Sequence, residues 1–332
     1  MKVKKILKYF GISVAILIGV VVVSGQIAHY NLPVIDPPGK IFLVNGTKMH
    51  LYCTGPENEE QPTIIIINGA SIVSPTYYPL QERLSKNVRT CSYDHAGVGW
   101  SEPNNVPANA KNMSNELFQL LYAAKIEGPV FLVGHSLGGI VGLIYSAEHE
   151  DQVAGIAFID SSHYNQFDYF GKDYSDKIYN QMGWAETSFG GMEILSSLGI
   201  LNLIGIISGS SQPIDDNLQI TNNYYFILDS PFLSMKSEIV NLELSLSQGK
   251  EAFYPRGDLP IISLSASDID FTNLPQTELS EKEMKDVFRS FHKELADLST
   301  NGKHVIVDET DHMSIIQNEN TAEQILNLIL KK

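Results

Sequence analysis

The segment 134–138, with the sequence Gly-His-Ser-Leu-Gly, holds the residue types that nucleophilic catalysis requires. It joins an apolar run at residues 130–133, which is typical of a strand, to a small-residue segment at 138–148, which is typical of a helix. A Gly-x-Ser-x-Gly motif at such a corner forms a tight, strained turn in which the glycines leave room and the serine hydroxyl is exposed. We therefore predict that Ser136 is a nucleophile.

A serine hydroxyl is a weak nucleophile at neutral pH, so it needs a base to take its proton and an acid to orient that base. With this motif the chain order is serine, then aspartate or glutamate, then histidine. Among nine histidines, His312 is the best base, because it follows the predicted strand 305–307. His304 opens that strand, which predicts a place at the wrong end of the sheet. The weaker candidates follow other strands or adjoin the nucleophile, namely His95, His163 and His135, the last with a side chain expected to point elsewhere.

Two aspartates could orient the base, since each follows an apolar strand that precedes His312. Asp160 ends the predicted strand 153–159, and Asp268 follows the predicted strand 261–265. These positions leave both aspartates open as the acid.

Several motifs together resemble those of the α/β-hydrolase superfamily, in particular its membrane-anchored bacterial branch. They are the Gly-x-Ser-x-Gly segment, Asn-Gly-Ala at 68–70 in place of the family's His-Gly, Ser-Tyr-Asp-His-Ala-Gly-Val-Gly-Trp-Ser at 92–101, Asp-Ser-Ser-His at 160–163, and Asp-His at 311–312. The resemblance spans residues 38–332 and is weakest at 164–256. It implies that the loop after the later strand often lacks an aspartate, which favours Asp160 as the acid and keeps Asp268 as the alternative.

Acyl transfer also needs hydrogen-bond donors for the oxygen that becomes negative, and fixed backbone N–H groups serve this purpose well. One donor is expected to be the N–H of Leu137, at the start of a helix whose dipole favours an anion. The other is expected after the predicted strand 64–67, at Ala70 or at Ser71. Together these two N–H groups would form an oxyanion hole.

The elements that must position these residues form an α/β sheet with helices on both faces. Eight strands, mostly parallel, are predicted at residues 40–44, 48–53, 63–68, 88–94, 130–133, 153–159, 261–265 and 304–307. The first two are expected to form a hairpin through Asn45-Gly46, since that pair adopts the positive φ angles of a tight turn. Apolar residues at helical spacing within 113–124 and 284–298 predict helices that pack on the sheet.

Residues 164–256 interrupt the alternation of strands and helices and are rich in Tyr, Phe and Met. The resemblance implies a helical lid there, which divides the catalytic core into residues 31–163 and 257–332. An apolar lid would exclude water and hold a hydrophobic group. We therefore expect hydrolysis of a carboxylic ester with a hydrophobic portion through an acyl-enzyme, as in carboxylesterases and lipases. An amidase, a peptidase, an acyltransferase and a non-catalytic surface binding protein are the alternatives.

The composition of the chain limits the classes of molecule that it is expected to bind. The chain has 332 residues, 43% of them hydrophobic, and a net charge of −15. Such an acidic chain is not expected to bind nucleic acid. The sequence lacks the spacing of metal ligands and of phosphate-binding loops, so neither a metal nor another cofactor is expected.

The first 30 residues predict a membrane anchor. Four lysines precede residues 9–28, which carry no charge, and 20 helical residues span about 30 Å, the thickness of the hydrocarbon core of a bilayer. Because positive flanks stay inside, the catalytic domain is expected outside the cytoplasm, at the cell membrane. A cleaved signal peptide, and thus a secreted protein, is the alternative.

Cys53 and Cys91 lie in predicted strands that would be neighbours in this fold. Paired residues on adjacent strands have Cα atoms about 5 Å apart, within the range of a disulfide. A bridge would fit an extracytoplasmic location. Two buried, reduced thiols remain the alternative.

Overall fold

The computed structural model describes residues 2–31, 36–58, 60–201, 203–204, 232–269, 275 and 277–330. The chain divides into two compact units. One consists of Met1–Asp36 and Thr187–Leu233, and the other, which holds the sheet, consists of Pro37–Glu186 and Ser234–Lys332.

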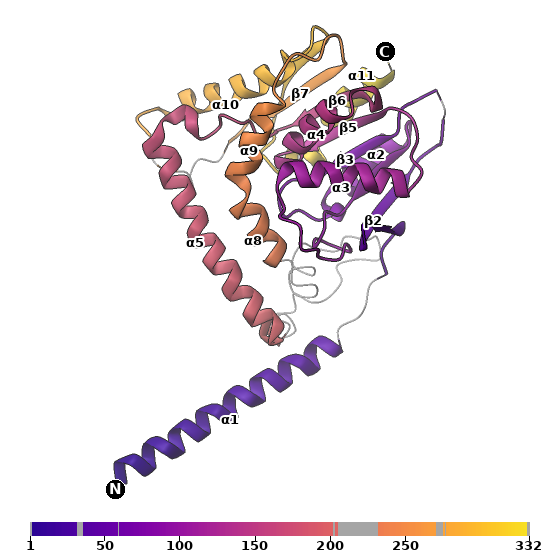
Figure 1. The fold of residues 1–332 in the computed structure, drawn as a ribbon. Coiled ribbons are helices and arrows are strands. Elements are labelled where there is room, and N and C mark those ends of the chain that lie inside the picture. Colours follow the sequence, from indigo (N-terminus) through magenta and orange to yellow (C-terminus); the bar gives the residue numbers. More distant parts are fainter. Residues whose placement is uncertain are drawn as a thin grey trace. The chain divides into compact units, whose positions relative to one another are not determined.

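An eight-stranded sheet forms the centre of the larger unit (Figure 1), which confirms the predicted fold class. The strands are β1 (Lys40–Val44), β2 (Thr47–Thr54), β3 (Ile64–Ile67), β4 (Thr90–Tyr93), β5 (Val130–His135), β6 (Val153–Ile159), β7 (Ile261–Ala266) and β8 (Gly302–Val307). Their order is β1-β2-β4-β3-β5-β6-β7-β8, and β2 is antiparallel to both of its neighbours while the strands from β4 to β8 are parallel. The carboxyl ends of the parallel strands therefore meet at one edge of the sheet.

Local features account for the turn between β1 and β2 and for the end of β5. Asn45 and Gly46 have φ angles of 50° and 88°, as a tight turn with two positive φ angles requires, and they join β1 to β2 in the predicted hairpin. Strand β5 runs two residues beyond the predicted end at Val133, because Gly134 and His135 continue the ladder with β6. The nucleophile motif thus begins inside the sheet.

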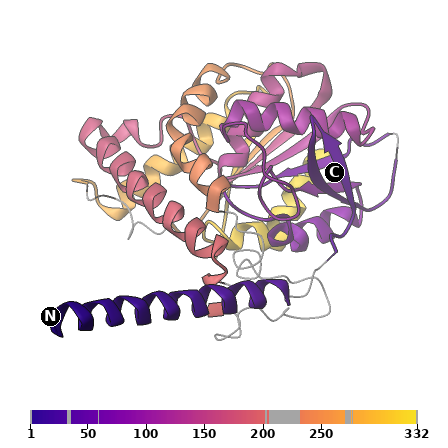
Figure 2. The same cartoon turned by 60° about the horizontal axis from the view of Figure 1, so that its bottom comes forward.

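Helices cover both faces of the sheet (Figure 2). Side chains of α2 (Tyr78–Ser85) and α11 (Glu319–Leu330) form one apolar cluster with one face. Side chains of α3 (Ala110–Ala123), α4 (Leu137–Glu148), α9 (Leu242–Glu251) and α10 (Glu281–Ala296) form a second cluster with the other face. Short 3-10 helices lie at Ser74–Tyr77, Glu150–Gln152, Asp168–Phe170 and Ser314–Gln317. Successive residues of a strand point to opposite faces, so the apolar strands supply both clusters.

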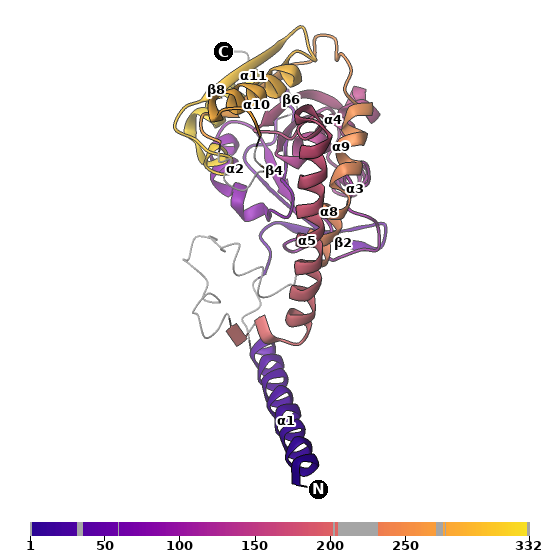
Figure 3. The same ribbon diagram turned by 90° about the vertical axis from the view of Figure 1, so that its left-hand side faces the viewer.

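The described part of the predicted lid is helical. It contains α5 (Lys172–Ser197), α8 (Phe232–Val240) and α9, whereas residues 205–231 of the predicted lid lie outside the described residues. Helix α9 lies beside α3 and α4 (Figure 3). The hydroxyls of Ser237 and Ser245 accept the backbone N–H groups of Ala108 and Ala110, each at 3.0 Å. Polar contacts therefore fix α8 and α9 at the start of α3.

The smaller unit contains α1 (Lys2–Tyr30), a helix of 29 residues. Of the helices in the described ranges, it is the one long and apolar enough to cross a membrane, with a mean hydropathy of 2.5. Its backbone at Gly25 packs so closely against Gly199 that a Cβ atom on Gly25 would lie 2.5 Å from the carbonyl oxygen of Gly199. The Gln26 amide donates to the carbonyl of Ser197 at 3.0 Å.

Cys53 of β2 lies opposite Cys91 of β4 in the register of the sheet. The structure joins the two by a disulfide with an S–S distance of 2.06 Å and a Cα–Cα distance of 4.0 Å. The bond links the antiparallel edge of the sheet to its parallel part.

Candidate active site

Ser136 lies between the end of β5 and the start of α4, at the predicted strand-to-helix corner. Its φ and ψ angles are 52° and −125°, a conformation that costs about 1–3 kcal/mol for a residue with a side chain. The flanking glycines leave no room for substitution: a Cβ atom on Gly138 would lie 2.2 Å from the carbonyl oxygen of Ile67, and one on Gly134 would lie 2.5 Å from that of Gly138. The turn therefore needs the small residues of the motif.

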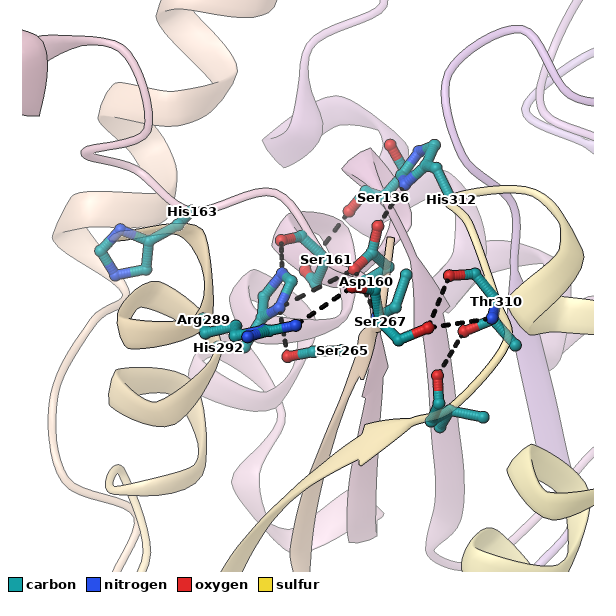
Figure 4. Close-up of polar contacts among 12 residues, drawn as sticks. Ser136, Asp160, Ser161, His163, Ser265, Ser267, Arg289, His292, Thr310 and His312 are labelled. Atoms are coloured by element: carbon teal, nitrogen blue, oxygen red, sulfur yellow. Dashed lines mark hydrogen bonds and ion pairs between the residues drawn. The ribbon is translucent and has the colours of Figure 1, made fainter. Parts of the chain in front are cut away.

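Asp160 and His312 form a hydrogen-bonded pair (Figure 4), with Nδ1 of the imidazole 2.6 Å from Oδ2 of the carboxylate. Asp160 directly follows β6, and His312 lies on the loop after β8. The other carboxylate oxygen, Oδ1, accepts the N–H of Ala266 at 3.0 Å. Burial favours the neutral acid, but the hydrogen bond from His312, the electrostatic effect of the His292 and His312 rings and the N–H of Ala266 outweigh it and hold the pKa of Asp160 below its usual range. The carboxyl group that contacts His312 is thus ionised.

The other predicted acid contacts the loop of His312 through its backbone, since the Asp268 N–H donates to the carbonyl of Thr310 at 2.8 Å, but its carboxyl group has a different partner. The carboxyl group of Asp268, 75% exposed, accepts a hydrogen bond from the ammonium group of Lys285 on α10 at 2.6 Å. The structure thus brings Asp160 to His312 and pairs Asp268 with a lysine.

A chain of hydrogen bonds holds the loop of His312 against the nucleophile turn. His135, which precedes Ser136, is fully buried, and its Nε2 lies 2.8 Å from the carbonyl oxygen of His312. A carbonyl oxygen can only accept, so Nε2 carries the proton and Nδ1 accepts the hydroxyl of Tyr77 at 2.9 Å. Burial and the charge of His312 lower the pKa of His135 to about 3, which keeps the ring neutral. The two imidazole rings lie 4.6 Å apart, so the ring of His135 lies beside that of His312.

The loop after β3 borders Ser136. A Cβ atom on Gly69 would lie 3.1 Å from the Cβ of Ser136, and the Gly69 N–H donates to the hydroxyl of Tyr77 at 2.8 Å. The buried amide of Asn68 donates to the carbonyls of Tyr93 and Ile72 at 2.9 and 3.1 Å. Asn68, which stands in place of the family's histidine, therefore fixes the shape of this loop.

The two predicted oxyanion donors directly follow the two residues of this contact in the chain. Leu137 is the first residue of α4, where backbone N–H groups have no acceptor within the helix. Ala70 is exposed, and Ser71, which follows it, has a φ angle of 59°. The role of both donors stays a prediction.

A buried carboxyl group that no sequence motif marks also contacts this loop. Glu238 of α8 is 2% exposed and accepts the hydroxyl of Ser71 at 2.7 Å. Burial raises the pKa of Glu238 to about 7, although the hydrogen bonds from Ser71 act to lower it. A helix of the predicted lid region thus holds the loop that carries Ala70.

The remaining candidate histidines have structural contacts. Nε2 of His95 lies 3.4 Å from the carbonyl oxygen of Asn68, the ring of His163 stacks on Phe291, and His304 lies within β8 with Nε2 2.7 Å from the hydroxyl of Ser265. In the described ranges no group of three His, Cys, Asp or Glu side chains is arranged to hold a metal ion.

Comparisons with known proteins agree with this fold. A family model described as the alpha/beta hydrolase fold matches residues 62–203. An uncharacterized protein of Schizosaccharomyces pombe is 26% identical over 200 residues, which are 52% of this chain and 36% of that protein. The monoglyceride lipase of Rattus norvegicus is 29% identical over 136 residues, which are 39% of this chain and 44% of that protein. The chain thus spans less than half the length of either relative.

Among solved structures, an epoxide hydrolase from Vigna radiata has a TM-score of 0.61 at 18% identity and covers 88% of this chain and 98% of its own. At that identity the likeness shows the fold alone. The sheet order and the family match together show that the chain has the α/β-hydrolase fold.

Proposed function

We propose that this protein is a serine hydrolase that cleaves a carboxylic ester with a hydrophobic portion through an acyl-enzyme. Ser136 is the nucleophile, His312 the base and Asp160 the acid, and the N–H groups of Leu137 and Ala70 form the oxyanion hole. The single observation that carries the proposal is the 2.6 Å hydrogen bond between His312 and an ionised Asp160, at the edge of the sheet where Ser136 lies. The ring of His312 is 48% exposed, so substrate can reach it.

The residues divide the reaction into two halves. The hydroxyl of Ser136 attacks the carbonyl carbon while Nε2 of His312 takes its proton, and the resulting oxyanion lies on the two N–H groups. The bond to the leaving oxygen then breaks, and His312 returns the proton to that oxygen, which releases the alcohol. A water molecule then attacks the acyl-enzyme by the same two steps and releases the carboxylic acid product. Asp160 stays ionised throughout and stabilises the imidazolium.

Two observations favour a substrate with an apolar group. The region between β6 and β7 packs aromatic rings around α10, with Tyr169 5.5 Å from Phe291 and Phe170 6.2 Å from Phe288. A monoglyceride lipase is among the relatives, and its name denotes an ester of glycerol. Amides and acyl transfer to alcohols use the same serine chemistry, and the assay below compares esters with amides.

We also propose that α1 anchors the protein in the cell membrane with the catalytic unit outside the cytoplasm. The lysines at the start of the helix and its apolar length support this orientation. A disulfide between Cys53 and Cys91 fits an oxidising compartment. Recovery of the chain in the medium, cut after the helix, would instead indicate a secreted protein.

A fluorophosphonate probe on the full-length protein in detergent tests the nucleophile. We expect covalent labelling of the wild type and none of Ser136→Ala. Ser114→Ala is the matched control, because it removes another buried serine hydroxyl, one that contacts Glu148 on a different helix. p-Nitrophenyl esters of increasing chain length then test the substrate class. A folded wild type that takes no label would favour a binding protein, and turnover of amides in preference to esters would refute the ester assignment.

A further inference from the structure

Asp160 has a strained backbone that its surroundings must hold in place. Its φ angle is 39°, in the left-handed region that residues with side chains rarely adopt. The Asp160 N–H donates to the carbonyl of Leu264 at 2.7 Å, and the N–H of Ser162 donates to the carbonyl of Ser136 at 3.0 Å. The turn that carries the acid therefore shares a hydrogen bond with the nucleophile itself.

Ser161 lies between Asp160 and Ser162 in this turn, and a buried histidine forms a hydrogen bond with it. His292 of α10 is 4% exposed, and its Nε2 lies 3.1 Å from the carbonyl oxygen of Ser161 (Figure 4). Its Nδ1 lies 2.6 Å from the hydroxyl of Ser265 and 3.8 Å from Oδ1 of Asp160. Both ring nitrogens thus face polar groups next to the acid rather than the apolar core.

The partners determine where the protons lie. The carbonyl of Ser161 can only accept, so Nε2 of His292 carries a proton. Burial lowers the pKa of His292, which favours the neutral ring, and Nδ1 therefore accepts the hydroxyl proton of Ser265. The oxygen of Ser265 accepts in turn from Nε2 of His304 at 2.7 Å. Each hydrogen bond in this chain therefore points the same way, from β8 to β7, then to α10, and finally to the turn that carries Asp160.

The neutral ring also keeps Asp160 available to the base. An imidazolium 3.8 Å away would compete with His312 for the negative charge of the carboxylate. Held neutral, His292 fixes the backbone of the turn without withdrawing the carboxylate from its catalytic partner.

We propose that His292 is a positioning residue for the reaction: by holding the carbonyl of Ser161 it fixes the turn that presents Asp160 to His312. The inference rests on the proposed function, since it assumes that Asp160 is the acid.

The test uses the full-length protein and His292→Phe, which keeps an aromatic ring and removes both nitrogens. Active sites are first counted with the fluorophosphonate probe, so that rates refer to competent enzyme. We expect kcat on a p-nitrophenyl ester to fall about 10- to 100-fold, the usual effect of a small misplacement of a catalytic group, while KM changes less than about twofold. We also expect the acidic limb of the kcat profile to move to lower pH, because a misplaced carboxylate stabilises the imidazolium of His312 less.

His163→Phe is the matched control, because His163 is a second buried histidine and its ring stacks on Phe291 of the same helix at 4.8 Å. It should leave kcat and the acidic limb unchanged. Ser265→Ala, which removes one hydroxyl, should change both in the same direction as His292→Phe but less, and it decides the question if His292→Phe does not fold.

Loss of rate without movement of the acidic limb, or an unchanged rate, would overturn the positioning role. Failure of the proposed function gives a different result, since the wild type would then neither take the probe nor hydrolyse esters.

Discussion

The buried carboxyl of Glu238 should make the protein less stable as the pH rises, and Glu238→Gln should remove that dependence. Glutamine has nearly the same shape, and its side-chain oxygen can still accept the hydroxyl of Ser71, but it does not titrate. Any constant effect of the substitution therefore cancels when the two proteins are compared at two pH values.

The size of this stability loss follows from the pKa of Glu238 in the unfolded and in the folded protein. The pKa of Glu238 rises from 4.5 to about 7 on folding, through burial, so the folded state holds the proton more tightly. Its contribution to stability is complete below pH 4.5 and is lost as the pH rises to 7. At about 1.4 kcal/mol per pH unit, the total loss is about 3 kcal/mol. Between pH 5 and pH 8 the loss is about 2.5 kcal/mol.

Thermal unfolding of the full-length protein in one detergent measures this effect. We expect the Tm of Glu238→Gln, relative to wild type, to be higher at pH 8 than at pH 5 by about 4 °C, from the usual unfolding entropy of a domain of this size. Glu243→Gln, at an exposed glutamate of the neighbouring helix α9, is the control and should give the same difference at both pH values. If Glu238→Gln also gives the same difference at both, the carboxyl does not titrate as its burial requires.

Three further outcomes are expected. Asp160→Asn should lower kcat for ester hydrolysis by about four orders of magnitude, because the amide favours the wrong tautomer of the base, whereas Asp268→Asn should change kcat less than about twofold; the reverse pattern would exchange their roles. A maleimide added to the denatured, unreduced chain should label neither Cys53 nor Cys91, and labelling before reduction would refute the bridge. Gly138→Ala, whose methyl group would lie 2.2 Å from a carbonyl oxygen of β3, should lower stability by about 1–3 kcal/mol or more, and an unchanged Tm would contradict the crowding.

Much of the sheet could be predicted because strands such as β3 and β6 are short apolar runs bounded by residues that favour turns. The prediction at 153–159 and strand β6 (Val153–Ile159) coincide. Strand β5 exceeded its prediction because Gly134 and His135 resemble turn residues by type but continue the ladder beside β6. Composition thus located the strands, while pairing with a neighbour determined where they end.

The acid could not be chosen from the residues, since Asp160 and Asp268 both follow a strand before the base. What separates them is local geometry and a charge from another element. A φ angle of 39° presents Asp160 to His312, and the ammonium group of Lys285 on α10 engages Asp268. The helix was predicted from its apolar stripe, but the direction of its charged side chains was not.

Glu238 and His292 could not be identified from the sequence for a related reason. Their partners, Ser71 and Ser161, lie 167 and 131 residues away, and neither pair forms a motif. A single glutamate or histidine on an amphipathic helix is usually solvated or part of the core. Only the fold shows that each one ends at a loop of the active site.

These contacts explain how two strained residues persist in one site. Ser136 and Asp160 both have positive φ angles, and each would relax if its neighbours allowed it. The carbonyl of Ser136 accepts the N–H of Ser162 from the turn of the acid, so neither turn can relax without breaking a bond to the other. Residues in one hydrogen-bond network do not contribute independently. Ser136 and Asp160 are therefore coupled as one strained unit, and the hydrogen bond between His292 of α10 and Ser161 supports it.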